Sequence, residues 1–99
     1  MIVRVEVAPP LTEVFGYRGT GRLVIEQTMK KGNLADLLNT LIREYPGFGE
    51  YALELGSVVP VCPHVLVALN NEIITVRNKL NLALRNGDVL ILLPEFLGG

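Results

Sequence analysis

The stretch that decides the fold is Gly87-Asp88-Val89-Leu90-Ile91-Leu92-Leu93-Pro94-Glu95-Phe96-Leu97-Gly98-Gly99, at the C-terminal end of the sequence. A Gly-Asp turn precedes five consecutive apolar residues, which predicts a buried strand. Pro94 is expected to end this strand, because its ring removes a backbone donor from the ladder. We therefore expect the remaining residues to be a short tail ending in Gly98-Gly99. The rest of the chain would be a scaffold for this tail, with the chemistry at the terminal carboxylate.

The predicted last strand is apolar on both of its faces. Val89, Ile91 and Leu93 share one parity, and Leu90 and Leu92 share the other. The chain offers only one substantial helix, which can cover one face of a sheet. One of the two sets therefore has no obvious cover within the chain. An uncovered apolar strand face beside the tail predicts a partner-binding surface.

Two strands and one strong helix are predicted upstream. Residues 2–7 alternate apolar and charged side chains, and a second strand is expected at 22–27, antiparallel to the first. Asn33 is a suitable N-cap for the helix, because its side-chain oxygen can accept from a free amide of the first turn. Pro46-Gly47 is expected to end the helix after Tyr45. Its apolar stripe follows helical spacing: Leu34, Leu37, Leu38, Leu41 and Ile42.

The segment 48–63 has the least regular pattern. Residues 51–55 could form a further helical turn, and 58–62 a loop or edge strand. A third strand is predicted at 64–69, nearly apolar throughout, and Asn70-Asn71 is a plausible tight turn because Asn tolerates positive φ. A short return strand is expected at 73–76, followed by apolar anchors at Leu80, Leu82 and Leu84. The order predicts an α+β fold: a mixed sheet of four to five strands covered on one face by one main helix.

Composition limits the class of protein. The 99 residues predict a single domain, 1–99, and 49% hydrophobic against 19% charged residues indicates a folded chain. Nine basic against ten acidic residues do not suggest nucleic-acid binding. The longest apolar runs are far shorter than the roughly 20 residues that span a bilayer. With one cysteine, no internal disulfide and no cysteine-based metal site can form, so we expect a cytoplasmic protein that holds no metal.

The tail carries the candidate chemistry. Gly98 and Gly99 lack a Cβ, so they can lie extended in a channel too narrow for other side chains. An activating enzyme would have to bring the Gly99 carboxylate to the α-phosphate of ATP, because a free carboxylate is a poor electrophile. The alternative is a frayed tail without function. Phe96 and Leu97 are apolar, which suggests docking in a partner groove, or alternatively folding back onto their own sheet.

Other candidate residues favour structural roles. Cys62 could be a nucleophile, and His64 lies two residues away, but the chain has no second histidine for a dyad or a metal site. Pro60 and Pro63 flank Cys62, which favours a structural loop cysteine. The pair Lys30-Lys31 is most simply a solvated turn before the helix. No phosphate loop, dinucleotide fingerprint or nucleophile elbow is present.

The chain resembles the ubiquitin-like β-grasp sulfur carriers of the MoaD/ThiS family, most of all the small subunit of molybdopterin synthase. The likeness covers nearly the whole chain, and its specific part is the hydrophobic strand that leads to Pro94 and Gly98-Gly99. The family usually has two prolines and small residues before the glycines, where this chain has 95–97, Glu-Phe-Leu. Supporting matches are 11–16 after the first strand, the Leu-rich helix, the strand ending at 67–70, and Leu84-x-x-Gly87-Asp88.

The resemblance implies a single β-grasp domain with a flexible Gly98-Gly99 tail and no catalytic role of its own. An E1-like enzyme would use ATP to adenylate the Gly99 carboxylate, and a sulfur donor would convert it to a thiocarboxylate. The tail, with Pro94, Phe96, Leu97 and Gly98 as recognition residues, would then enter a large synthase subunit and deliver sulfur to a pterin precursor. The carrier itself would bind no cofactor. Partner-binding positions implied by the family are Ile73 and Leu93, and Ile91 shares the parity of Leu93.

Three other functions stay open at this point. Activated Gly99 could form isopeptide bonds with lysines of other proteins, as in a ubiquitin-like modifier. Sulfur delivery to the thiamin thiazole is a second possibility, which the long 48–63 segment disfavours. The third is a β-grasp interaction module that is never conjugated and whose glycine pair is accidental.

Overall fold

The computed structural model describes residues 1–54 and 56–95. Within them the strands are β1 (Ile2–Val7), β2 (Leu23–Thr28), β3 (Val65–Leu69), β4 (Glu72–Ile74) and β5 (Val89–Pro94). The helices are α1 (Leu34–Glu44) and α2 (Pro46–Ala52), with the shorter 3-10 helices η1 (Leu11–Phe15) and η2 (Val76–Asn78).

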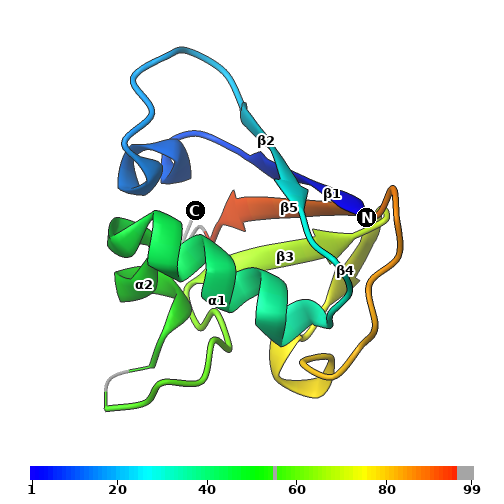
Figure 1. Cartoon of the computed structure of the whole chain (residues 1–99). Helices are drawn as coiled ribbons and strands as arrows, with labels where there is room; N and C mark the ends of the chain where they lie inside the picture. Colours follow the sequence, from blue (N-terminus) through cyan, green and yellow to red (C-terminus); the bar gives the residue numbers. More distant parts are fainter. Residues whose placement is uncertain (55, 96–99) are drawn as a thin grey trace.

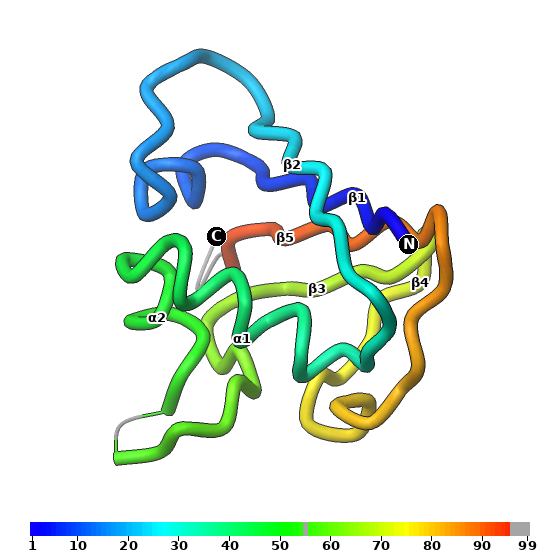
Figure 2. Tube along the Cα trace, in the orientation of Figure 1, coloured from blue at the N-terminus to red at the C-terminus, as the bar shows by residue number. Residues whose placement is uncertain are grey.

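The strands form one mixed sheet in the order β2-β1-β5-β3-β4 (Figure 1). β5 is the central strand, parallel to β1 and antiparallel to β3. The first and last strands of the chain therefore lie side by side, as the blue and red segments show in Figure 2. The predicted α+β fold is confirmed, with five strands. It is the ubiquitin-like β-grasp arrangement, in which a helix lies across a mixed sheet.

Helix α1 begins where the sequence predicted. The Asn33 side-chain oxygen accepts from the Asp36 backbone N–H, and the Asp36 carboxylate accepts from the Asn33 N–H, both at 2.9 Å. This capping box satisfies two backbone donors that have no partner within the helix. The leucines of the predicted stripe are fully buried and Ile42 is partly buried against the same core: Leu34, Leu37, Leu38 and Leu41.

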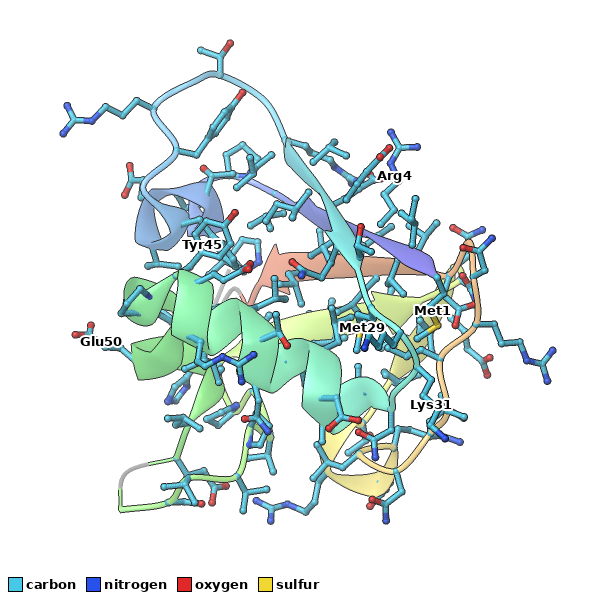
Figure 3. The ribbon with its side chains drawn as sticks, viewed as in Figure 1. Met1, Arg4, Met29, Lys31, Tyr45 and Glu50 are labelled. Atoms are coloured by element: carbon cyan, nitrogen blue, oxygen red, sulfur yellow. The ribbon has the colours of Figure 1, made fainter. Side chains whose placement is uncertain are left out.

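The prediction that Pro46-Gly47 ends the Leu-rich helix is confirmed, and a second helix begins directly after it. Helix α1 does end at Glu44, but α2 begins at Pro46. Proline suits the first position of a helix, because its missing N–H would have no partner there. The buried Phe48 ring then packs on Phe15 of η1 with 4.9 Å between ring centroids. Tyr45 follows α1, and its ring centroid is 5.1 Å from that of the same Phe15 ring. Figure 3 shows Tyr45 between η1 and the helices.

Smaller differences occur on either side of β3. The predicted helical turn at 51–55 is wrong in its bounds, because α2 ends at Ala52; Leu55 lies outside the described residues. The predicted return strand ends at Ile74, and Val76 begins η2. Asn70 and Asn71 adopt positive φ values of 49° and 70°, as predicted for the tight turn.

The three leucines predicted as apolar anchors before β5 have different environments. Leu84 is buried and Leu80 is partly buried against the core. Leu82 is 39% exposed, so that prediction was wrong at this position. The three leucines are two residues apart in the sequence. This spacing does not determine which of them faces the core in a segment without regular secondary structure.

Candidate functional site

The face of the sheet opposite the helices carries a continuous apolar patch across three strands. Cross-strand pairs set its composition: Leu66 lies opposite Leu93, and Ala68 lies between Ile91 on one side and Ile73 on the other. Directly paired residues have Cβ atoms only about 4.5–5.5 Å apart, so these side chains touch. We call this set, which has one parity in β3, β4 and β5, the open apolar face: Leu66, Ala68, Ile73, Ile91 and Leu93.

Exposure within the open apolar face rises toward the edge of the sheet. Ile73, on the edge strand β4, is 65% exposed, and Leu66 is 37% exposed. Ile91 and Leu93 in the central strand are half-buried. Ile73, Ile91 and Leu93, which the sequence analysis named as a partner surface, thus lie together on one face.

Leu66 and Ala68 belong to the same face and were missed in the sequence. The run at 64–69 is apolar nearly throughout, so its sequence shows no alternation that would distinguish one face of the strand from the other. The pairing of Leu66 with Leu93 is what places Leu66 on the uncovered side. The only available signal was parity combined with the register between β3 and β5, and register depends on residues about 25 positions apart.

Charged side chains of β1, and of Arg22 just before β2, border the open apolar face. Glu6 lies opposite Ile91 in the register of β1 and β5. Its carboxylate is 3.0 Å from the Arg22 guanidinium and 3.5 Å from that of Arg4. Recognition surfaces commonly combine an apolar centre with a polar rim. On the open side of this sheet, β3, β4 and β5 carry the apolar residues, and the charged residues lie at β1.

The tail leaves the sheet beside the open apolar face. Pro94 is the last residue of β5 and pairs with Val65, so its predicted role as the end of the strand is confirmed. Glu95 follows and is exposed. The predictions made at Phe96, Leu97, Gly98 and Gly99 lie outside the described residues. The last apolar side chain of the face, Leu93, is therefore only one residue from the end of the strand.

Cys62 lies in the hydrophobic core, in agreement with a structural role. Its side chain is buried, and its Sγ lies 3.9 Å from the Pro60 carbonyl oxygen. Burial raises the pKa of the Cys62 thiol to about 12, which keeps it protonated and unreactive at neutral pH. His64, in contrast, is exposed. Among residues 1–54 and 56–95, no three potential metal ligands gather into one group.

Comparison with protein families decides where the chain belongs. The model of the ThiS family matches residues 17–99, which is most of the sequence. The chain belongs to the ThiS family. ThiS proteins and the related MoaD proteins are small β-grasp sulfur carriers that are not themselves enzymes, and the family implies no bound cofactor. In the part of this ThiS-family chain that the structure describes, no helix is long and apolar enough to cross a membrane.

Solved structures agree with the fold. SAMP1 from Haloferax volcanii is 22% identical with a TM-score of 0.73, each chain being covered completely. Small archaeal modifier protein 1 from Methanosarcina acetivorans is 24% identical with the same TM-score, over 99% of this chain and 96% of the other.

The complex of subunits 1 and 2 of the molybdopterin-converting factor from Helicobacter pylori contains a chain 28% identical to this one. That match covers both chains completely, with a TM-score of 0.56. A comparison with curated protein sequences found no match to this ThiS-family chain.

Proposed function

We propose that this ThiS-family protein is the sulfur carrier of molybdopterin synthesis, acting through a thiocarboxylate on Gly99. The observation that carries the proposal is the family match, which extends to residue 99 and so includes the glycine pair. The 28% identity to the chain of the Helicobacter pylori molybdopterin-converting factor complex supports the molybdopterin branch. In this proposal residues 1–99 act as one domain, and a cytoplasmic location stays a prediction.

The proposed reaction needs two activation steps on the carrier. A carboxylate oxygen of Gly99 attacks the α-phosphorus of ATP on an E1-like enzyme, and pyrophosphate leaves. A hydrosulfide equivalent from a sulfur donor then attacks the acyl carbon, and AMP leaves. In the large synthase subunit the thiocarboxylate sulfur attacks a carbon of the pterin precursor and displaces an oxygen leaving group from it. Water then attacks the Gly99 acyl carbon, the acyl carbon–sulfur bond breaks, the sulfur stays on the pterin as a thiolate, and the Gly99 carboxylate is restored. The carrier supplies the reacting atom, while acid and base groups come from its partners.

The open apolar face is the proposed docking surface for both partners. Its most exposed member, Ile73, lies at the sheet edge, and Leu93 is next to the residue that ends β5. A partner seated on this face would find Pro94 and the tail residues that follow within reach. The Glu6 ion pairs would lie at the rim of such a contact. One face serving both partners implies that the activating enzyme and the synthase subunit bind in turn, not together.

Intact mass is the measurement that tests the proposal. The intact mass of the protein would be measured by mass spectrometry before and after incubation with an E1-like enzyme, ATP and a sulfur donor. We expect a gain equal to the replacement of one oxygen by sulfur, and no gain in a chain from which Gly99 is deleted. Adding the large synthase subunit and the pterin precursor should reverse the gain. A gain that persists with these partners but is reversed by the thiazole-forming enzyme would move the function to thiamin synthesis.

A ubiquitin-like modifier is the second candidate, because its first step is the same adenylation of Gly99. The similarity to the archaeal modifier from Methanosarcina acetivorans, at 24% identity, extends to the fold. In the same experiment a modifier would appear as high-mass adducts on the lysines of other proteins. If an enzyme of proven activity produced neither thiocarboxylate nor adducts, the chain would be an interaction module that is never conjugated.

A further inference from the structure

A pocket opens on the helix side of the sheet at the point where β5 ends. It has a volume of about 280 Å³, and its walls come from segments far apart in the sequence. Leu11 and Val14 come from η1, Tyr51 comes from α2, and Pro63 precedes β3. Pro94 and Glu95, the last two described residues of the chain, line the same pocket. The pocket therefore lies at the base of the tail.

The pocket and the open apolar face are on opposite sides of the sheet. Pro94 pairs with Val65 and has the parity of the buried Leu92. Leu93 has the other parity and belongs to the open apolar face. Side chains alternate along an extended chain, so an extended continuation of β5 would place the residue two positions after Pro94 on the side of the pocket. That residue is Phe96.

The pocket is large enough for a phenyl ring, and part of its wall is apolar, although Glu13, His64 and Glu95 also line it. An apolar cavity of about 150 Å³ is enough to hold benzene, and this pocket is larger. Tyr51, an aromatic residue of the wall, is 38% exposed in the described residues. A second ring beside it would bury part of that surface and make the tilted or offset contact that aromatic pairs favour. Consecutive Cα atoms are about 3.8 Å apart. Phe96 follows Pro94 by two residues, so this short length of chain is enough to bring its ring to the pocket that Pro94 lines.

Charge distinguishes the base of the tail from its end. Among the described residues that line the pocket, Glu13 and Glu95 carry carboxylates, His64 carries an imidazole, and none is lysine or arginine. A carboxylate such as that of Gly99 would be repelled from this rim, whereas an apolar ring would not. The pocket thus favours the apolar Phe96 and disfavours the carboxylate of Gly99.

We propose that Phe96 occupies this pocket in the free protein and leaves it when a partner draws the tail into its active site. This inference rests on the proposed function, because it concerns how the Gly99 carboxylate is presented. With Phe96 held, only three residues follow, which reach about 10 Å when extended, against about 14 Å for the four residues after Glu95. The pocket would therefore set how far the carboxylate extends before a partner binds.

A tryptophan reporter tests the proposal on the whole chain. The protein contains no tryptophan, so Phe96→Trp introduces a single indole. We expect its emission to be blue-shifted and its quenching by acrylamide to be several-fold slower than that of a solvated indole. Adding Tyr51→Lys, which places a charge in the pocket wall, should remove this protection. Adding Val58→Lys should not, because Val58 is 85% exposed and outside the pocket lining.

Two further measurements keep the outcome decisive. In the unsubstituted protein, we expect nuclear Overhauser effects between the Phe96 ring and the methyl groups of Val14. An indole as accessible as a solvated one, with no such effects, would overturn the proposal. The proposal would also be overturned if Leu66→Lys removed the protection of the indole from acrylamide and Tyr51→Lys did not. In that case the tail would lie on the open apolar face. Deleting Gly99 should leave the protection intact while abolishing thiocarboxylate formation, which separates a failure here from a failure of the proposed function.

Discussion

Leu92 and Leu93 are neighbours of the same residue type in β5, yet they lie on two different surfaces. Leu92 is fully buried beneath the helices, in one cluster with Val7 and the α1 leucines. Leu93 is half-buried, lies opposite Leu66, and belongs to the open apolar face. The comparison teaches that an apolar side chain in this strand contributes to the fold or to recognition according to its parity. The predictions below test that division.

Truncating the covered side of β5 should have the largest effect on stability. Leu92→Ala removes a fully buried side chain, and large-to-small core changes of this kind typically cost about 3 kcal/mol of unfolding free energy. Leu93→Ala is the matched control and should cost well under half as much, because its side chain keeps contact with water. Urea unfolding followed by circular dichroism measures both. Equal losses would mean that the open apolar face is covered in the free protein.

The thiol in the core should make stability depend on pH. Burial raises the pKa of the Cys62 thiol from 9.0 to about 12. Between these two values the unfolded chain loses its thiol proton and the folded chain keeps it. Unfolding free energy should therefore fall as pH rises above 9, by up to about 1.4 kcal/mol per pH unit from this group.

Cys62→Ala supplies the reference for that measurement, since other groups titrate equally in both proteins. The difference in unfolding free energy between the two should be constant from pH 7 to 8.5 and should narrow from pH 9 upward. A difference that stays constant to pH 10.5 would place the thiol in contact with water.

A charge on the open apolar face should weaken partner binding without unfolding the chain. Ile73→Asp places a carboxylate at the most exposed position of the face, and a desolvated charge at an interface costs about tenfold or more in affinity. Val24→Asp is the matched control: Val24 lies opposite Glu6 on the same side of the sheet, beyond the apolar patch, and is 44% exposed. Titration calorimetry with the large synthase subunit measures both. A similar loss for the two variants would contradict the assignment of the patch.

Destabilising helix α1, which covers one face of the sheet, should have the smallest effect on the unfolding free energy. Asn33→Ala removes one half of the capping box of α1, and such changes usually cost about 1 kcal/mol. Asn39→Ala, on the exposed side of the same helix, should be close to neutral or slightly stabilising. Thermal unfolding of the two variants compares them directly. If Asn39→Ala were the more harmful change, the cap would not be what sets the start of the helix.

Local chemistry explains which parts of the fold were predictable. The Asn33 cap, the Asn70-Asn71 turn and the end of β5 at Pro94 depend on one residue and its immediate neighbours. Helix α2 was missed because a heptapeptide containing one proline and two glycines has little tendency to form a helix alone. The burial of Phe48 against Phe15 stabilises it, and that contact joins residues 33 positions apart.

The same distinction applies to the site. Both faces of β5 are apolar, and one predicted helix can cover only one of them, so the sequence indicated one uncovered face. Because both faces are apolar, the sequence could not determine which of them the helix covers. The chain crossing that places both helices on one side of the sheet made Leu90 and Leu92 the covered pair (Figure 1).

Sequence alone specified the periods of the strands and of α1, the N-cap of α1 at Asn33, the end of β5 at Pro94, and the presence of the glycine pair. These properties follow from short-range backbone preferences and from residue identity. Tertiary structure decided that Leu66 joins Ile73, Ile91 and Leu93 on one face, and that η1, α2 and the end of β5 enclose a pocket at the base of the tail. The physical reason is that cross-strand register and packing depend on contacts between residues far apart in the chain, which no local pattern encodes.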